Sequence, residues 1–181
     1  MNTLFTIPNL LSILRMCFTF LFVHSLLNDK ITKSILFLSI CILTDFLDGF
    51  FARVFKQKTK IGVLLDPLAD KVLVISTLIV LMVKNYLPWW FFSIIIIRET
   101  LVIAGWIVTY QHTPQSFPKP RFLGKVSIAL LMITLIIVVL NIHLQYEIVS
   151  DIINELFFLT SVFVTGSLVD YIGYARKVFS K

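Results

Sequence analysis

Six apolar stretches, each about as long as a membrane-spanning helix, constrain the fold of this chain more than any other feature of its sequence. A helix needs about 20 apolar residues to cross the hydrocarbon core of a bilayer. We place the stretches at Pro8–Leu27, Ser34–Phe55, Gly62–Val83, Pro88–Tyr110, Phe122–Leu140 and Ile148–Tyr174. The sequence therefore predicts an all-α integral membrane bundle of six transmembrane helices, forming a single domain over residues 1–181.

The composition of the chain supports this interpretation. Hydrophobic residues make up 58% and charged residues 14% of the sequence, and the mean hydropathy is +0.94. Soluble domains carry about 25% charged residues. These values exclude a soluble globular enzyme, a disordered chain and a disulfide scaffold. We expect the lipid bilayer, and no nucleic acid, as a partner. Cys17 and Cys41 lie inside apolar stretches, where we expect small buried side chains.

Basic residues are distributed unequally between the two ends of the stretches. Lys30, Lys33 and Lys84 fall on one side. The other side holds Arg53, Lys56, Lys58, Lys60, Lys119, Arg121, Lys125, Arg176, Lys177 and Lys181. Because cytoplasmic loops carry an excess of Lys and Arg, we expect both termini to be cytoplasmic in a multi-pass protein of the cytoplasmic (inner) membrane. The first seven residues contain no Lys or Arg, so we expect no cleaved signal peptide.

Four carboxylates lie within these apolar stretches. Asp45 and Asp48 are three residues apart near the end of the second stretch, and Asp66 and Asp70 are four apart near the start of the third. Each spacing places both acids of a pair on one helix face. A short basic loop joins the two stretches, so we expect antiparallel neighbours whose acids converge near the cytoplasmic surface. Charges inside a membrane helix are costly and usually functional.

Three explanations of such a cluster remain open. Four carboxylates in a small volume cannot all stay ionised without a counter-charge. They could share protons, pair with Arg53 and Lys71, or bind divalent metal ions. Oxygen ligands without His or Cys favour Mg, Mn or Ca over Zn. Each acid also has an ordinary alternative, since Asp66 before Pro67 could be a helix N-cap and the acids of the second stretch could be interfacial.

A longer pattern runs through these acids. It reads Asp45-x2-Asp48-Gly49-x2-Ala52-Arg53-x8-Gly62-x3-Asp66-x3-Asp70. The pattern resembles the signature of the CDP-alcohol phosphatidyltransferases, and every position matches. Further similarity to this family lies in Ile7–Leu11 with Arg15, Leu65–Lys71, Arg98-Glu99 and Leu123–Lys125. These outer segments are most similar to members that make phosphatidylglycerophosphate and to the related cardiolipin synthases.

The resemblance implies a transferase of phospholipid biosynthesis that moves the phosphatidyl group of CDP-diacylglycerol to an acceptor hydroxyl and releases CMP. It also implies two divalent ions, Mg or Mn, and a homodimer. The implied metal ligands are Asp45, Asp48, Asp66 and Asp70, with Asp70 also the catalytic general base. The implied CDP pocket contains Asp48, Gly49, Ala52, Arg53 and Gly62. Without the resemblance, the small residues could serve only helix packing, and Arg53 could be a positive anchor at a helix end.

A second group of basic residues is a candidate site for the acceptor. Arg15, Arg98, Lys125 and Arg176 form this group, and the last three are our predicted acceptor ligands. Three cations suit the phosphate monoester of glycerol 3-phosphate, which we predict as acceptor, with phosphatidylglycerol as the alternative. Lys125 and Arg176 could instead reflect topology alone. Arg98 could pair with an acid, although we do not expect the adjacent Glu99 to share its helix face.

A divalent-cation transporter is the alternative from another class, because intramembrane acids can mark ion pathways. Transporters commonly place their site at the midplane, between internal repeats. Here the acids gather at one edge and no repeat is visible, which favours the transferase. His24, His112 and His143 are scattered over different stretches and support no histidine metal site.

Overall fold

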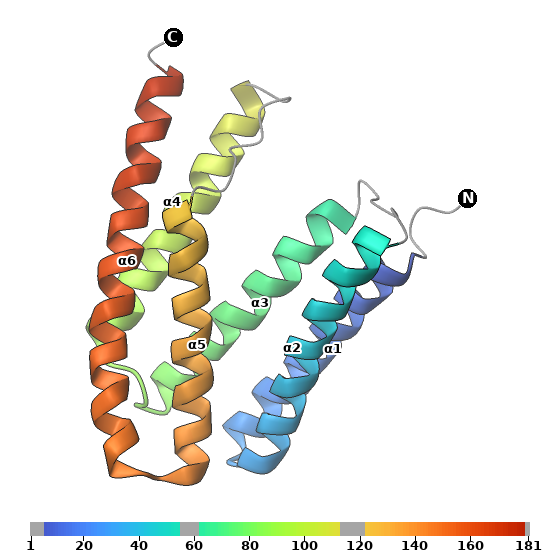
Figure 1. Cartoon of the computed structure of the whole chain (residues 1–181), viewed down its shortest axis with the longest axis vertical. Coiled ribbons are helices and arrows are strands. Elements are labelled where there is room, and N and C mark those ends of the chain that lie inside the picture. Colours follow the sequence, from blue (N-terminus) through green and yellow to red (C-terminus); the bar gives the residue numbers. More distant parts are fainter. Residues whose placement is uncertain (1–5, 55–61, 113–121, 180–181) are drawn as a thin grey trace. The chain divides into compact units, whose positions relative to one another are not determined.

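The computed structural model describes residues 6–54, 62–112 and 122–179, and in those residues it contains six α-helices and no strand (Figure 1). The helices are α1 (Ile7–Leu27), α2 (Ile31–Val54), α3 (Gly62–Val83), α4 (Trp89–His112), α5 (Phe122–Leu144) and α6 (Glu147–Phe179). The predicted all-α fold with six helices is confirmed. The helices α5 and α6 extend past the predicted apolar stretches at their C-terminal ends, because helical hydrogen bonding continues through polar residues.

Three of these helices are long and apolar enough to cross a membrane. Among the residues described, the candidate spans are Asn9–Leu27, Phe122–Leu144 and Glu147–Gly173. The helices α2, α3 and α4 are of similar length, and each includes residues whose side chains lie outside the described part of the chain. The protein is therefore an all-helical protein with membrane-spanning helices, and the six-span topology stays a prediction.

The internal contacts divide the chain into two compact units. The first, Met1–Lys84, contains α1 to α3, and the second, Asn85–Lys181, contains α4 to α6. We describe each unit by itself. The single domain over residues 1–181 stays a prediction.

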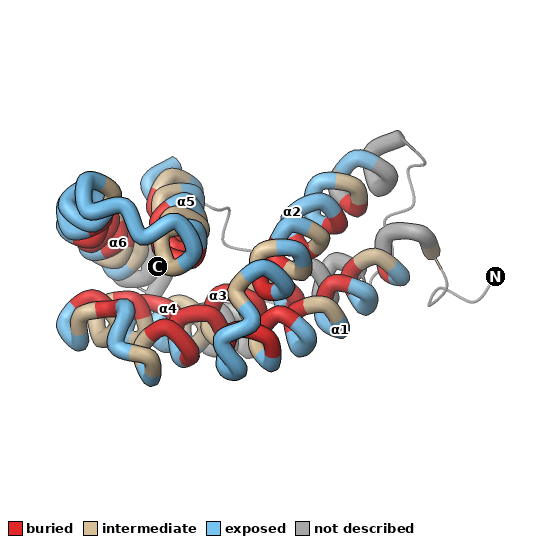
Figure 2. The backbone as a smooth tube through the Cα atoms, turned by 90° about the horizontal axis from the view of Figure 1, so that it is seen from below, coloured by how far each residue is buried: buried red, intermediate tan, exposed pale blue. Residues whose placement is uncertain are grey.

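In the first unit, α1 packs against both α2 and α3. The buried residues of α1 are largely polar: they are Asn9, Ser12, Arg15, Thr19, Phe22, Ser25 and Leu26. Figure 2 marks the buried positions of each helix in red. Large apolar side chains such as Leu10, Ile13 and Phe20 point outward instead. This inversion suits a helix surrounded by lipid, where polar side chains find partners only between helices.

A tight turn joins α1 to α2. Asp29 adopts the left-handed conformation, with φ of 56°. The amide of Lys30 donates to the carbonyl oxygen of Ser25 at 2.9 Å, and the amide of Asp29 donates to the carbonyl oxygen of Leu26 at 3.3 Å. These two bonds form a Schellman motif, which satisfies carbonyls at the end of α1 and stops the helix. The side chain of Asp29 also pairs with Lys84 at the end of α3.

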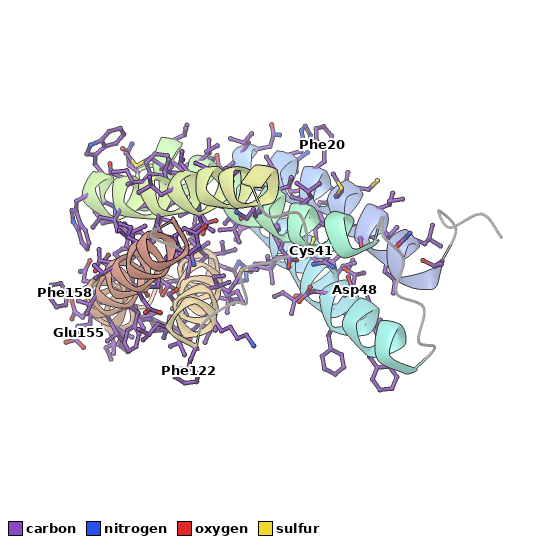
Figure 3. All side chains as sticks on the ribbon, turned by 90° about the horizontal axis from the view of Figure 1, so that it is seen from above. Phe20, Cys41, Asp48, Phe122, Glu155 and Phe158 are labelled. Carbon is purple, nitrogen blue, oxygen red and sulfur yellow. The ribbon has the colours of Figure 1, made fainter. Side chains whose placement is uncertain are left out.

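In the second unit, α6 packs against both α4 and α5. The rings of Phe91 on α4 and Phe157 on α6 lie 4.7 Å apart between centroids. Thr134 on α5 and Thr160 on α6, both fully buried, share a hydrogen bond of 2.9 Å. The outer side of α6 is exposed, and Figure 3 shows Glu155 and Phe158 pointing away from its neighbours.

Candidate active site

Three carboxylates of the first unit meet at one guanidinium group. The Nη1 atom of Arg15 on α1 donates to Asp45 Oδ1 on α2 at 2.6 Å and also to Asp70 Oδ1 on α3. The Nη2 atom of Arg15 donates to Asp48 Oδ2 on α2, the residue labelled in Figure 3. We call Arg15, Asp45, Asp48 and Asp70 the acid cluster. It joins three consecutive helices through residues that are 30 and 55 positions from Arg15 in the case of Asp45 and Asp70.

The acid cluster extends from the interior of the unit to an exposed side. The side chains of Arg15 and Asp48 are 1% and 5% exposed. Those of Asp45 and Asp70 are 56% and 45% exposed. Two carboxylates are thus accessible, while the cation that joins them is buried.

The backbone of Arg15 is also fixed. Its carbonyl oxygen accepts hydrogen bonds from Thr19 Oγ1 at 2.8 Å and from Cys41 Sγ on α2 at 3.8 Å. The Nε atom of Arg15 is buried without a hydrogen-bond partner in the described part of the chain. Cys41 is a small buried side chain, as its place in an apolar stretch predicts, but the same prediction for Cys17 is wrong because Cys17 is exposed on α1.

Ion pairing was one of three explanations for the acids, with Arg53 and Lys71 as the proposed cations. The structure shows pairing with Arg15, a residue that the sequence groups with the candidate acceptor cations. The side chain of Arg53 lies outside the described residues. The signal for Arg15 was its position inside an apolar stretch, where a charge requires a partner.

The other predicted CDP and metal residues can be placed only by backbone. Gly49, Ala52 and Arg53 belong to α2, and Gly62 and Asp66 belong to α3. Their side chains and surroundings lie outside the part of the structure that is described. Arg121 lies outside it altogether.

The donor set of the acid cluster fits a hard divalent cation. Asp45, Asp48 and Asp70 offer oxygen ligands only, which Mg and Mn prefer. Among the described side chains, no group of three or more His, Cys, Asp or Glu residues is close enough to hold a metal ion. The three carboxylates surround Arg15 rather than a common empty point, and the fourth predicted ligand, Asp66, is not among the described side chains.

In the second unit, Arg98 pairs with Glu99. Both side chains are buried, and Arg98 Nη1 donates to Glu99 Oε1. The expectation that Glu99 cannot share the face of Arg98 is therefore wrong. Adjacent helix positions diverge at Cβ, but two long side chains can bend toward each other when both are buried. The Nε atom of Arg98 is buried without a hydrogen-bond partner among the described residues.

Of the two other predicted acceptor residues, Lys125 and Arg176, the structure describes the side chain of Lys125 only. Lys125 is exposed near the start of α5. Arg176 lies in α6 by backbone, and its side chain is outside the described residues.

Comparison with known proteins identifies relatives over most of the chain. The family model for CDP-alcohol phosphatidyltransferase matches residues 5–169. The chain is 32% identical over 168 residues to a CDP-diacylglycerol–glycerol-3-phosphate 3-phosphatidyltransferase of Aquifex aeolicus, covering 91% of this chain and 93% of that protein. A protein of the same name from Escherichia coli K12 is 30% identical over 183 residues, covering 95% of this chain and 96% of that protein. A CMP-forming cardiolipin synthase of Streptomyces coelicolor is 34% identical over 130 residues, covering 67% of this chain and 59% of that protein.

Proposed function

The chain belongs to the CDP-alcohol phosphatidyltransferase family, and we propose that it transfers the phosphatidyl group of CDP-diacylglycerol to glycerol 3-phosphate and releases CMP. The observation that carries this proposal is similarity along nearly the whole length of relatives named for that reaction. The family and its relatives are transferases, so the transporter alternative has no support from them.

Divalent metal ions are part of this proposal. The family generally depends on such ions. We propose that Asp45, Asp48, Asp66 and Asp70 hold two of them, Mg or Mn, because the acid cluster supplies oxygen ligands. Bound there, the ions would neutralise the diphosphate and stabilise the leaving oxygen.

Residues of the chain itself would accept the proton of the acceptor hydroxyl and bind the CDP group. Asp70 is half-exposed on α3, so an acceptor hydroxyl can approach it and give up its proton to the carboxylate. The CDP group would lie against Asp48, Gly49, Ala52, Arg53 and Gly62, where small residues allow the backbone to come close to the nucleotide. The guanidinium of Arg53 can bond phosphate or base through its planar fork.

The acceptor site would be formed by Arg98, Lys125 and Arg176. A phosphate monoester carries up to two negative charges, and charge-assisted bonds from such cations are strong. A lipid phosphodiester carries one, so the group suits glycerol 3-phosphate better. Phosphatidylglycerol is the second candidate acceptor, favoured by the similarity to the cardiolipin synthase.

The setting we propose is the cytoplasmic (inner) membrane. Three apolar helices support membrane insertion, and the distribution of basic residues supports six spans with both termini and the active site facing the cytoplasm. A homodimer is also part of the proposal. A methyl group added at Gly166 would meet nothing within 4 Å among the described residues, so α6 has an open flank there.

The experiment that tests the function supplies purified protein with CDP-diacylglycerol and either glycerol 3-phosphate or phosphatidylglycerol. We expect CMP release with glycerol 3-phosphate. Turnover only with phosphatidylglycerol would show that phosphatidylglycerol, not glycerol 3-phosphate, is the acceptor. The proposed CDP and metal residues would be unaffected. No CMP release with either acceptor would contradict the proposed reaction.

A further inference from the structure

Arg15 lies at the centre of the acid cluster, but the proposed reaction assigns it no role. Its guanidinium is almost fully buried and bonds three carboxylates on two other helices. Asp45 and Asp48 come from α2, and Asp70 comes from α3. A guanidinium is always charged and its rigid fork can bond several carboxylates at once, which an ammonium cannot do equally well. Arg15 is thus a resident counter-charge for acids that would otherwise repel one another.

The carboxylates that bond Arg15 are three of the four proposed metal ligands. A divalent ion that approaches these oxygens meets a positive charge already in contact with them. Like charges at such distances in a poorly solvated site repel strongly. Arg15 and a divalent ion therefore compete for the same oxygens.

The exposure of the acid cluster makes this exchange feasible. Asp45 and Asp70 are half-exposed, so an ion can reach them without unfolding the helices. The buried Nε atom of Arg15 has no hydrogen-bond partner among the described residues, so the group is not fully satisfied where it lies. A purely structural arginine would be expected to use all of its donors.

We propose that Arg15 is a positioning residue that assembles the acid cluster before metal binds and gives up the carboxylates when divalent ions enter. This inference rests on the metal site of the proposed function. Before metal binds, Arg15 holds α2 and α3 against α1 through their acids. During binding, its charge lowers the affinity of the site for the ions.

A purely structural role makes the opposite prediction for metal affinity. If Arg15 only supported the fold, its removal would let the acids separate, and metal binding would weaken. If Arg15 competes with the ions, its removal strengthens metal binding and weakens the metal-free protein. The sign of the change in metal affinity thus separates the two roles.

The test measures Mn²⁺ binding to the full-length protein in nanodiscs after treatment with EDTA, with free Mn²⁺ followed by electron paramagnetic resonance. We expect Arg15→Gln to bind Mn²⁺ about tenfold more tightly than wild type, a coupling of the size found between contacting charged groups. Arg15→Lys keeps the positive charge but loses the planar guanidinium group. The affinity of this variant for Mn²⁺ should therefore lie between those of wild type and Arg15→Gln. Lys33→Gln, an exposed position near the other end of α2, is the matched control and should bind as wild type does.

A second measurement compares thermal unfolding with and without Mn²⁺. Without metal, Arg15→Gln should unfold at a lower temperature than wild type. Mn²⁺ should raise its unfolding temperature by more than it raises that of wild type, because tighter binding gives greater stabilisation. An Arg15→Gln variant that folds only when Mn²⁺ is present would also support the inference, because its folded state would then depend entirely on bound Mn²⁺.

The outcomes separate this inference from the proposed function. If wild type binds Mn²⁺ but Arg15→Gln binds it equally or less tightly, the inference is overturned and the metal site stands. If Arg15→Gln folds in neither condition, Arg15→Lys decides, and an affinity equal to that of wild type overturns the inference. If wild type binds no Mn²⁺, the proposed metal site fails and the inference fails with it.

Discussion

Asp70 and Asp48 belong to the same acid cluster but differ in exposure, at 45% and 5% of their side chains. The more exposed carboxylate is the better placed to receive a proton from a small soluble acceptor. We expect Asp66→Asn and Asp70→Asn each to lower turnover by at least about 10²-fold, the lower range for a positioned acid–base group. The rate of CMP release with glycerol 3-phosphate is the measurement.

Asp151→Asn is the control for these two variants. Asp151 is exposed on α6, near the turn that joins it to α5, and should not affect the reaction. A comparable loss of turnover at Asp151 would mean that the proposed cytoplasmic site is on the wrong side of the membrane.

Lys125 and Arg98 differ in a way that decides how the acceptor site can be tested. Lys125 is exposed, whereas Arg98 is buried against Glu99, so replacing Arg98 also removes a partner of a buried acid. We therefore expect Lys125→Ala to raise the acceptor KM about 10–100-fold, the range for one lost charge-assisted hydrogen bond. The KM for CDP-diacylglycerol should stay the same. An unchanged acceptor KM would show that the pocket lies elsewhere.

These residues also show what a sequence can predict about a site. The spacing of Asp45 and Asp48 predicts a shared helix face, because that relation is local. The partner of these acids was not predicted, because Arg15 reaches them only when α1 packs against α2 and α3. The pair of Arg98 and Glu99 was excluded by a rule about Cβ directions that ignores the length of the side chains.

Whole elements were predicted better than their contacts. A helix that crosses a bilayer needs a minimum length of apolar sequence, and counting apolar residues predicted the six helices that the described residues form. The C-terminal ends of α1 and α3 were predicted correctly, at Leu27 and Val83. The helix α5 instead continues from its predicted end, Leu140, to Leu144, and Gln145, rather than glycine, adopts the left-handed conformation in the turn that follows it. Which face each helix buries depends on its neighbours, and the polar buried face of α1 reverses the pattern of a soluble helix.

The contact between α4 and α6 at Gly105 gives a test at this scale. A methyl group added to Gly105 would come within 2.3 Å of the hydroxyl oxygen of Tyr171 and within 2.7 Å of its Cε1. The ring must then move, so Gly105→Ala should lower the free energy of unfolding by about 1–3 kcal/mol, as overpacking does. Thermal or denaturant unfolding in detergent measures the change.

Two further variants make this test specific. Gly105→Ala should cost little in a Tyr171→Ala background, because the clash is gone. Gly173→Ala, where an added methyl group meets nothing within 4 Å among the described residues, should be neutral or slightly stabilising. A large loss in both tyrosine backgrounds would place the cause outside this contact.

At the scale of the whole molecule, the acid cluster predicts a strict requirement for metal. We expect EDTA to abolish CMP release and Mg²⁺ or Mn²⁺ to restore it, because the diphosphate and the carboxylates both carry negative charge. Zn²⁺ should restore little, since the site offers only oxygen ligands. Full turnover in metal-free buffer would contradict the two-ion proposal.

The proposed topology makes the last prediction, and it concerns the chain from end to end. The turns after α1 and α5 are short, and basic residues are concentrated at the opposite helix ends. Six spans therefore place Asn28 and Tyr146 outside the cytoplasm, and Lys58 and Lys181 inside it. Single cysteines at these four positions, in a Cys17→Ala and Cys41→Ala background, can be exposed to a membrane-impermeant maleimide in spheroplasts. We expect labelling at the first two positions in intact spheroplasts and at the last two only after permeabilisation. Labelling of Lys181→Cys in intact spheroplasts would mean an odd number of spans or an inverted protein. Inversion would also place the active site where soluble cytoplasmic glycerol 3-phosphate could not reach it.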